Sequence, residues 1–434
     1  MLGIIVIICL LVIELGVLFY CLKTKSKQRK VKSVIWICEL ALFCLLIILG
    51  IVQLSFRWYI LLIILLAQAI LGIVYFIKST ESKMVYKKKH FVLFFINRCV
   101  LLVFAIIPSV LFPQFKNIEP TGNYSVATES FTLTDTERIE TYSDDGDNRK
   151  VTIQFWYPDQ ESENKKFPLI IFSHGAFGFR GSNYSTFMEL ASNGYVVCSV
   201  DHTYQSFFSK QTDGNMVIVN NNFINDAIAV QNGDYDDVKT FQLTHEWLKL
   251  RTEDINLVLK TIIANSDNEN SDYIYKIIDV DKIGLSGHSL GGATAAELGR
   301  MRKDIDAVIV IDGTMIGEEI DYENGKSVLN SEAYPIPILN IYNEEHYNEA
   351  LLNSSNYANI VASRNAADSF DIVFNKSGHL SFTDLPLFSP LLAKMLGTGS
   401  IDKVYCIENM NNVVLNYFNY YLKDGKELNI SNEY

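Results

Sequence analysis

The stretch KIGLSGHSLGGATAAELG, residues 282–299, decides the fold that we expect for this chain. It begins as an apolar strand, passes through Gly287-His288-Ser289-Leu290-Gly291 and continues as an alanine-rich helix. Between a strand and a helix, the glycines of a GxSxG sequence allow a sharp turn that raises the serine hydroxyl clear of the sheet. The start of the following helix adds a positive dipole end, which stabilises a developing oxyanion. This context makes Ser289 the candidate nucleophile.

Apolar strand-like runs alternate with helical patterns on both sides of this turn, which indicates an α/β fold whose mostly parallel sheet is flanked by helices. We expect strands at 151–157, 168–173, 195–200, 282–286, 307–311, 337–342 and 370–374, and helices at 184–193, 252–264, 291–301 and 411–422. The polar, irregular segment 203–245 is rich in Asn and Asp and is too long for a simple connection. It predicts a cap-like insertion.

Charge divides the chain into two parts. Residues 1–116 contain 14 Lys/Arg and 3 Asp/Glu, whereas the remainder contains 23 Lys/Arg and 46 Asp/Glu. The remainder therefore carries a large negative charge and lacks the clustered basic face that a nucleic-acid-binding protein needs. We expect no nucleic-acid partner.

Four N-terminal stretches are long and apolar enough to cross a bilayer core, which takes about 20 helical residues. They are residues 2–22, 34–54, 60–77 and 91–112. The first stretch lacks the basic start and the small-residue cleavage site of a signal peptide, so we expect it to remain as a span. The predicted organisation is a transmembrane module at 1–113, a linker with edge strands at 114–150, and a catalytic domain at 151–430.

The short loops predict the orientation of this module, because Lys and Arg are enriched on the cytoplasmic side of a membrane. The loop 23–32 contains six basic residues and the loop 78–90 contains five lysines, whereas 55–59 contains only Arg57. The sequence thus predicts a multi-pass cell-membrane protein whose N-terminus and catalytic domain are extracytoplasmic. Its Lys, Asn and Ile content points to a bacterial source.

Three charged residues fall within the predicted spans. Glu14 lies inside the first span, where an ionisable group is a functional-site hypothesis by default, although a structural carboxyl is the alternative. Glu39 and Arg98 lie near the ends of their predicted spans, where long side chains reach the interface. With no pattern of an ion pathway, we interpret the module as an anchor.

A nucleophilic serine needs a base within hydrogen-bond reach, and His379 is the candidate. It follows the last predicted strand and lies downstream of Ser289, as the chain order of an α/β-hydrolase requires. Of the other histidines, His174 and His288 belong to glycine turns, His90 lies at the membrane edge, and the rest lie in connecting segments, namely His202, His245 and His346.

Two strand ends compete to supply the acid that orients His379. Asp312 follows the strand after the nucleophile helix, while Glu344 and Glu345 follow the next strand, and periodicity does not decide between them. For the oxyanion hole we expect the backbone N–H of Leu290 and that of Ala176, which lies in a glycine-lined turn after an earlier strand.

The cysteines predict neither a metal site nor a disulfide framework. Five of the seven lie in the apolar N-terminal stretches, and Cys198 and Cys406 are isolated in the soluble part, without CxxC spacing. Whether these two form a disulfide bond stays open at this point. The proposed serine chemistry requires no metal and no organic cofactor.

With these residues identified, the soluble part resembles the platelet-activating factor acetylhydrolase family, the plasma and intracellular type II serine enzymes with an α/β-hydrolase fold. The resemblance covers roughly 165–425 and rests on Phe172-Ser-His-Gly, Gly287-His-Ser-Leu-Gly-Gly-Ala-Thr, Val308-Ile-Val-Ile-Asp-Gly-Thr-Met and Gly378-His-Leu-Ser-Phe-Thr-Asp. Carried over by position, it makes Ser289, Asp312 and His379 the triad and favours Asp312 as the acid.

The resemblance also implies a substrate class, because this family removes short or oxidised sn-2 acyl groups from phospholipids without calcium. The chain departs from the family at Asp201-His202-Thr203-Tyr204, where basic residues are expected, and in its N-terminal spans. We therefore keep two alternatives: a general carboxylesterase or lipase acting on simple esters, and an inactive hydrolase-fold protein that serves membrane interactions. The expected partner in the first two cases is a lipid or small ester substrate.

Overall fold

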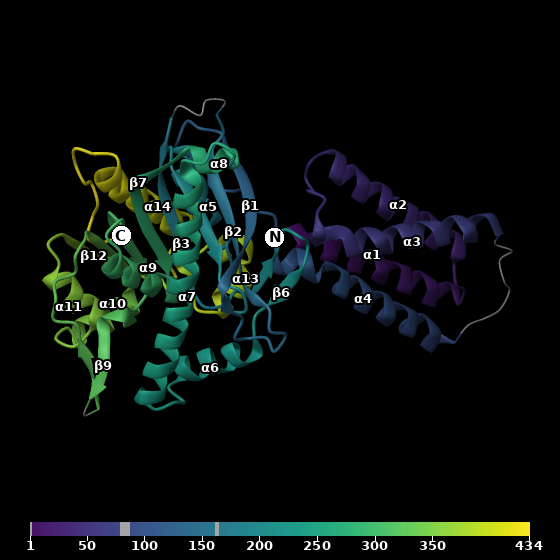
Figure 1. Ribbon diagram of the computed structural model, residues 1–434. Helices are drawn as coiled ribbons and strands as arrows, with labels where there is room; N and C mark the ends of the chain where they lie inside the picture. Colours follow the sequence, from purple (N-terminus) through teal and green to yellow (C-terminus); the bar gives the residue numbers. More distant parts are fainter. Residues whose placement is uncertain (1, 79–86, 161–164, 324) are drawn as a thin grey trace. The chain divides into compact units, whose positions relative to one another are not determined.

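The computed structural model describes residues 2–78, 87–160, 165–323 and 325–434 (Figure 1). The chain forms two compact units, Met1–Lys116 with Leu387–Leu392 and Asn117–Pro386 with Ala393–Tyr434. The first contains long apolar helices, and the second is a layered α/β unit. Each unit is considered separately below.

Four helices of the first unit are long and apolar enough to cross a membrane: α1 (Leu2–Thr24), α2 (Arg29–Ile48), α3 (Phe56–Lys78) and α4 (Lys88–Leu111). The boundaries predicted for the second stretch are wrong, because α2 begins five residues earlier than expected and ends at Ile48. Gly50 then adopts a left-handed conformation with φ +71° and turns the chain toward α3.

This shift corrects the interpretation of Glu39 and Arg98. Glu39 is the eleventh of the 20 residues of α2, and Arg98 is the eleventh of the 24 residues of α4. Both therefore lie near the middle of a helix. Neither is placed to reach an interface from a helix end.

An eight-stranded sheet forms the centre of the second unit, in the order β1-β2-β4-β3-β7-β8-β11-β12. The strands are β1 (Val126–Ile139), β2 (Asn148–Pro158), β3 (Phe167–Ser173), β4 (Val196–Asp201), β7 (Ile278–His288), β8 (Ala307–Ile311), β11 (Ile338–Asn343) and β12 (Ser369–Phe374). From β4 to β12 in this order, neighbouring strands pair in parallel. Strand β2 pairs antiparallel with both of its neighbours, β1 and β4. The carboxyl ends of the parallel strands therefore lie along one edge.

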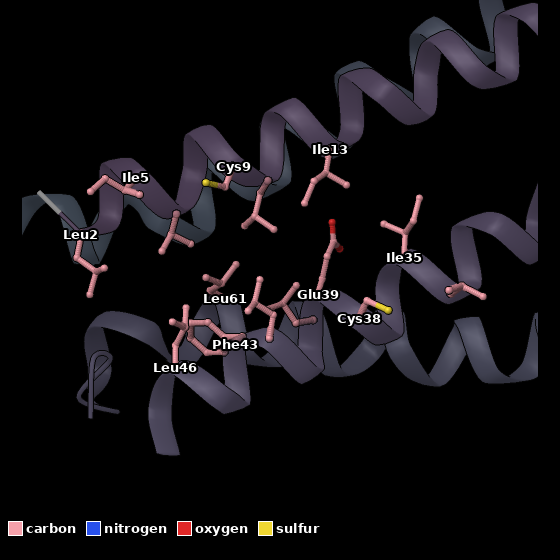
Figure 2. Close-up of a pocket in the computed structure, with 15 residues that line it drawn as sticks. Leu2, Ile5, Cys9, Ile13, Ile35, Cys38, Glu39, Phe43, Leu46 and Leu61 are labelled. Atoms are coloured by element: carbon pink, nitrogen blue, oxygen red, sulfur yellow. The ribbon is translucent and has the colours of Figure 1, made fainter. Parts of the chain in front are cut away.

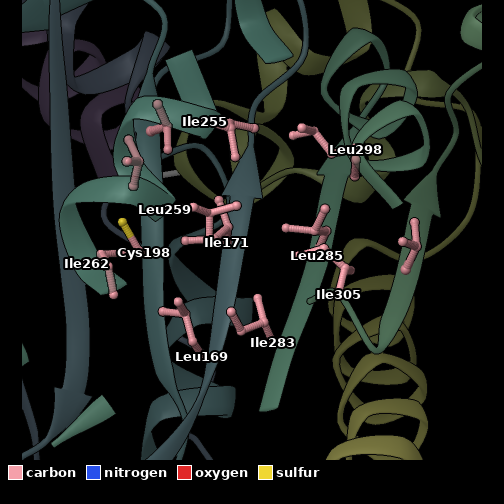
Figure 3. Packing of buried hydrophobic residues seen from close by; sticks show 14 of the residues in the cluster. Leu169, Ile171, Cys198, Ile255, Leu259, Ile262, Ile283, Leu285, Leu298 and Ile305 are labelled. Atoms are coloured by element: carbon pink, nitrogen blue, oxygen red, sulfur yellow. The ribbon is translucent and has the colours of Figure 1, made fainter. Parts of the chain in front are cut away.

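Both faces of the sheet are covered by helices, which explains why its strands are almost continuously apolar. On β3, Leu169 and Ile171 point to one face and Ile170 and Phe172 to the other. The first face packs against α7 (Asp237–Ser266), α8 (Tyr273–Lys276), α9 (Leu290–Met301) and α11 (Ala358–Asn365), and the second against α5 (Tyr184–Ser192) and α14 (Lys403–Leu422). Figure 3 shows the first cluster, where Ile255, Leu259 and Ile262 of α7 face the strands.

The two cysteines of this unit do not pair. Cys198 belongs to the apolar cluster on the first face, and Cys406 belongs to the cluster on the second, so the sheet separates them. Both thiols are free and buried. Burial raises the pKa of Cys198 well above its usual value and that of Cys406 to about 12.

The segment 203–245 is more regular than its sequence predicts. It contains the hairpin β5 (Phe208–Lys210) and β6 (Met216–Ile218), then α6 (Asn221–Asn232) and the first turns of α7, which begins at Asp237 and not near 252. Local capping explains this difference. The side chains of Asn220 and Asp236 accept hydrogen bonds from the first turns of α6 and α7, and Gly233 ends α6 in a left-handed conformation.

The remaining elements connect these layers. They are the 3-10 helix η1 (Ile316–Glu318), the hairpin β9 (Glu319–Glu323) and β10 (Lys326–Leu329), α10 (Glu344–Leu352), the 3-10 helix η2 (His379–Phe382), α12 (Leu385–Phe388) and α13 (Pro390–Met395). The closing helix α14 begins eight residues before the predicted start, where the Asp402 side chain caps its first turn.

Candidate active site

Ser289 lies at a sharp corner between β7 and α9. Its backbone has φ 56° and ψ −125°, a conformation that residues other than glycine rarely adopt. The neighbouring chain is packed so closely that a Cβ at Gly287 would lie 2.1 Å from the Gly291 carbonyl oxygen, and a Cβ at Gly291 would lie 2.0 Å from the Ser173 carbonyl oxygen. The glycines therefore let β7, α9 and the end of β3 approach one another, as a raised serine requires.

The two predicted oxyanion amides lie beside this corner. Leu290 is the first residue of α9, so its N–H is one of the donors that a helix start leaves unpaired. Ala176 follows Gly175, where an added Cβ would lie 3.1 Å from the Ser289 Cβ. In the part of the chain that the structure describes, neither amide donates a hydrogen bond to another protein group.

Asp312 is the carboxylate that meets His379. It follows β8 with φ 49°, is 3% exposed, and accepts a hydrogen bond of 2.7 Å from Nδ1 of His379 to its Oδ2. Glu344 instead accepts a hydrogen bond from the backbone N–H of Lys376. The structure thus brings Asp312, and neither of the competing glutamates, to the histidine.

Asp312 accepts three further hydrogen bonds. The backbone N–H and the side-chain amide of Asn343 donate at 2.8 and 2.6 Å, and Nδ1 of His346 donates to Oδ1 at 2.9 Å. Burial alone would raise the pKa of Asp312, but its hydrogen bonds and electrostatic interactions with His346 and His379 outweigh burial and hold this pKa well below its usual value. The carboxylate is therefore stabilised in its ionised form.

His346 is a residue whose role the sequence interpretation missed, because it was placed in a connecting segment. It lies on α10, and its Nε2 contacts the Tyr357 hydroxyl. Part of the signal was present in the sequence, because Asn is a preferred N-cap residue and Asn343 caps α10 by accepting a hydrogen bond from the His346 N–H.

The His379 side chain is 44% exposed, and Nδ1 is its ring nitrogen that hydrogen-bonds Asp312. Nε2 of His288 donates to the His379 carbonyl oxygen at 2.9 Å, and the two rings lie 4.6 Å apart between centroids. Burial, and next the charge of His379, lower the pKa of His288 to about 3, so His288 is a neutral donor. His288, the residue before Ser289, thereby holds the segment that carries His379.

The segments that carry Ser289 and His379 are joined by the hydrogen bond from His288 to the His379 carbonyl oxygen. Among the hydrogen bonds of the described residues, none joins Ser289 Oγ to His379 Nε2. In unliganded hydrolases this contact is often long or poorly aligned and tightens when substrate binds. The serine, the histidine and the aspartate thus converge at the carboxyl edge of the sheet, with only the His379–Asp312 contact formed.

A buried polar network lies beneath the turn that carries Ala176. His202, expected in a connecting segment, is fully buried and hydrogen-bonds Ser173 Oγ at 2.9 Å and Asp254 Oδ2 at 3.0 Å. Arg251, equally buried, donates to Gln205 Oε1 at 2.7 Å and to the His174 carbonyl oxygen. Arg251 therefore positions the peptide two residues before Ala176.

The other histidine expected in a connecting segment, His245, lies on α7 and bonds the backbone carbonyls of Phe241 and Glu319. Within the described residues, neither of these hydrogen bonds reaches a triad candidate. Within the ranges that the structure describes, no three His, Cys, Asp or Glu side chains are grouped as metal ligands.

The cap-like segment supplies an apolar wall beside the candidate amides. Buried side chains of α6 and α7 form a cluster with Val219, two residues before α6, and Ala176, Phe177 and Leu290 pack against it. Its buried members are Val219, Phe223, Ala227, Leu243 and Trp247. This apolar surface therefore adjoins both candidate amides.

Comparisons with known proteins agree with the resemblance. A family model described as platelet-activating factor acetylhydrolase, isoform II, matches residues 150–433. The platelet-activating factor acetylhydrolases of Bos taurus and Cavia porcellus are 28% and 26% identical over 189 and 174 residues. These matches cover 40% and 36% of this chain and 42% and 37% of the relatives, so the chain spans about two fifths of their length.

A solved structure of a ferulic acid esterase from Streptomyces cinnamoneus is similar with a TM-score of 0.55 and 19% identity. The similarity covers 72% of this chain and 95% of that one. At this identity the likeness concerns the fold alone. It confirms the predicted α/β-hydrolase architecture.

Proposed function

We propose, from the premise that this chain belongs to the platelet-activating factor acetylhydrolase isoform II family, that it is a membrane-anchored serine ester hydrolase. The observation that carries the proposal is the convergence of Ser289, at a strained strand-to-helix corner, with a His379–Asp312 pair hydrogen-bonded at 2.7 Å. Ser289 has a positive φ, and strained backbone of this kind is characteristic of functional sites.

In the proposed mechanism, Ser289 Oγ attacks the ester carbonyl while His379 Nε2 accepts its proton. The bond to the alcohol then breaks, and the imidazolium returns the proton to the leaving oxygen. Water deacylates the serine by the same two proton transfers in reverse. Asp312 holds the imidazole in the productive tautomer, and the N–H groups of Leu290 and Ala176 stabilise the tetrahedral oxyanion.

Arg251 supports this mechanism as a positioning residue. It fixes the His174 carbonyl and so orients the turn that presents the Ala176 amide. Its guanidinium is completely buried without a directly bonded carboxylate, and burial lowers its pKa to about 9. Burying an unpaired guanidinium is costly, which supports the proposal that Arg251 is needed to hold the oxyanion turn in position.

For the substrate we propose lipid esters with a short or modified acyl group, in particular at the sn-2 position of phospholipids. The family membership supports this class, and so does the apolar cluster beside Ala176 and Leu290. The four apolar helices support membrane anchoring, which raises the effective concentration of membrane-resident substrates. From the basic residues of the loops 23–32 and 78–90, we propose that the catalytic domain is extracytoplasmic.

A fluorophosphonate probe tests the serine assignment, because it labels only an activated serine. The detergent-solubilised wild-type chain should be labelled, and Ser289→Ala should lose both labelling and ester hydrolysis, with kcat lower by about 10⁶ as in the subtilisin precedent. Ser286→Ala is the matched control, since this buried hydroxyl on the same strand has no hydrogen-bond partner. Wild-type hydrolysis by Ser289→Ala would end the proposal.

A second experiment separates phospholipids from simple esters. We expect higher kcat/KM on phospholipids with a short sn-2 acyl group than on p-nitrophenyl esters of the same acyl length. The reverse order would favour the general carboxylesterase, which uses the same serine. An unlabelled but folded wild-type chain would instead favour the inactive interaction protein.

A further inference from the structure

Each of the four apolar helices carries one buried polar side chain near its middle. Glu14 on α1 is 2% exposed, Glu39 on α2 is 5% exposed, and Gln68 on α3 and Arg98 on α4 are both 7% exposed. In helices that are otherwise so apolar, buried polar groups are expensive and mark functional sites. We call these four residues the polar layer.

Three members of the polar layer satisfy one another. Arg98 donates from Nε to Glu14 Oε1 and from a terminal nitrogen to Gln68 Oε1, both at 2.9 Å. Glu39 is the exception, since neither of its carboxyl oxygens has a hydrogen-bond partner among the described residues. The layer thus contains two carboxyl groups but only one guanidinium, and that guanidinium is engaged elsewhere.

Glu39 borders a cavity of about 450 Å³ between α1, α2 and α3. This volume lies in the range of ordinary ligand sites. The other described residues that line it are aliphatic or aromatic side chains and two cysteines, Cys9 and Cys38. Figure 2 shows the Glu39 carboxyl pointing from α2 into the gap beneath Ile13 of α1.

The cavity and the carboxyl together describe the chemistry of an occupant. A buried acceptor without a donor costs about 1–3 kcal/mol, and more for a charged group. Hydrocarbon tails of lipids fill an apolar cavity but offer no donor. A ligand that satisfies both surfaces has an apolar chain and a small group that donates a hydrogen bond.

We propose that this cavity is a binding site for a single-chain amphiphile whose amine or hydroxyl group donates to Glu39 and whose chain lies along α1 and α2. Glu39 lies near the middle of a span, where a bulky charged head group would be costly, so the donor group of the ligand must be small. The site lies wholly within the helical unit. It depends on those helices lying in a membrane or detergent, and not on the proposed hydrolysis.

Photoaffinity labelling of the full detergent-solubilised chain tests this proposal. The probes are a long-chain amine and a long-chain alcohol, each with a diazirine near the head, and an alkane of equal length with the same diazirine. We expect the amine or the alcohol to label peptides of α1 and α2 about ten-fold more than the alkane. Labelling no greater than that by the alkane would overturn the proposal.

Variants at Glu39 locate the head group. Glu39→Leu removes the acceptors at similar volume, so the excess labelling should fall about ten-fold to the alkane level. Glu39→Gln keeps one acceptor but no charge. If this variant retains the excess labelling by the alcohol, the ligand donates from a hydroxyl group. If it loses the excess labelling by the amine, the ligand is cationic. Undiminished labelling of Glu39→Leu would contradict the site.

A matched pair of tryptophan substitutions keeps the test decisive if Glu39 variants fail to fold. Cys38→Trp fills the cavity, whereas Ile37→Trp adds the same side chain one residue away, outside the lining. Only Cys38→Trp should abolish the excess labelling, while both variants should elute as the wild-type chain does. Equal labelling of the two variants would overturn the proposal.

Discussion

Two buried carboxyl groups, one in each unit of this protein, have opposite surroundings. Asp312 in the α/β unit accepts four hydrogen bonds, from Asn343 twice and from His346 and His379. Glu39 in the helical unit is almost equally buried but has no hydrogen-bond partner among the described residues. The same functional group thus appears once fully satisfied and once unsatisfied.

The difference fits the separate roles that we propose for the two carboxyl groups. A carboxylate that is saturated by protein donors is held rigidly and can orient a neighbouring imidazole through many reaction cycles. A carboxyl that points into an apolar cavity without a donor instead leaves its hydrogen-bonding capacity for a group that the chain does not supply. Substitutions at the two sites should therefore affect different measurements.

The largest effect is expected for Asp312→Asn. The amide preserves the shape but favours the wrong tautomer of His379, so kcat for ester hydrolysis should fall about 10⁴-fold, as for the corresponding change in a Ser-His-Asp protease. Steady-state kinetics with a short-chain ester measures this, with circular dichroism to confirm folding. A loss of less than ten-fold would show that Asp312 is not the triad acid.

The same variant has a pH-dependent stability. Because the pKa of Asp312 is lower in the folded protein than its unfolded value of about 3.9, the ionised carboxylate stabilises the fold above that value. This contribution is lost as the pH falls below it toward the folded pKa. Denaturant unfolding should show a larger deficit for Asp312→Asn at pH 7 than at pH 3, and an equal deficit would contradict the assignment.

The next largest effect is expected for Glu14→Gln, which breaks a satisfied carboxyl within the polar layer. It leaves Arg98 without its charged partner, and removing one member of a buried ion pair costs about 3–5 kcal/mol. Thermal unfolding in detergent measures the loss. If Glu14→Gln were no less stable than Glu39→Gln, the contrast between a paired and an unpaired carboxyl would fail.

A smaller effect is expected for His346→Phe. This change removes one donor from Asp312 but leaves Asn343 and His379 in place, so kcat/KM should fall roughly ten-fold, in keeping with one lost hydrogen bond to a charged group. His245→Phe is the control, since the described hydrogen bonds of His245 go to two backbone carbonyls, those of Phe241 and Glu319. Equal losses in the two variants would indicate a general effect on stability.

The smallest effect is expected for Glu39→Gln without ligand. Because no described residue donates to Glu39, its replacement should change the free energy of unfolding by less than about 1 kcal/mol and leave kcat/KM for ester hydrolysis within two-fold. Thermal unfolding and ester kinetics on one preparation check both values. A large destabilisation would mean that the carboxyl has a structural partner.

The sequence alone predicts the parts of this protein that depend on local pattern. The strand, turn and helix around Ser289, the four apolar stretches and most of the parallel strands follow from hydrophobic periodicity and glycine placement. The position of His379 after the last strand made it a candidate for the same reason. Capping residues at Asn220 and Asp236 carried a signal for α6 and α7 that the polar composition hid.

Tertiary structure alone decided which side chains meet. Asp312, Glu344 and Glu345 all follow strands that end at the same edge, so periodicity left the three open and only the family resemblance favoured Asp312. The register of the sheet and the course of the last loop bring Asp312 to His379. His346 beside Asp312, and Glu39 apart from the Arg98 network, are likewise products of helix packing. Periodicity describes the face on which a residue lies, whereas a hydrogen bond depends on distances of about 3 Å between elements far apart in the chain.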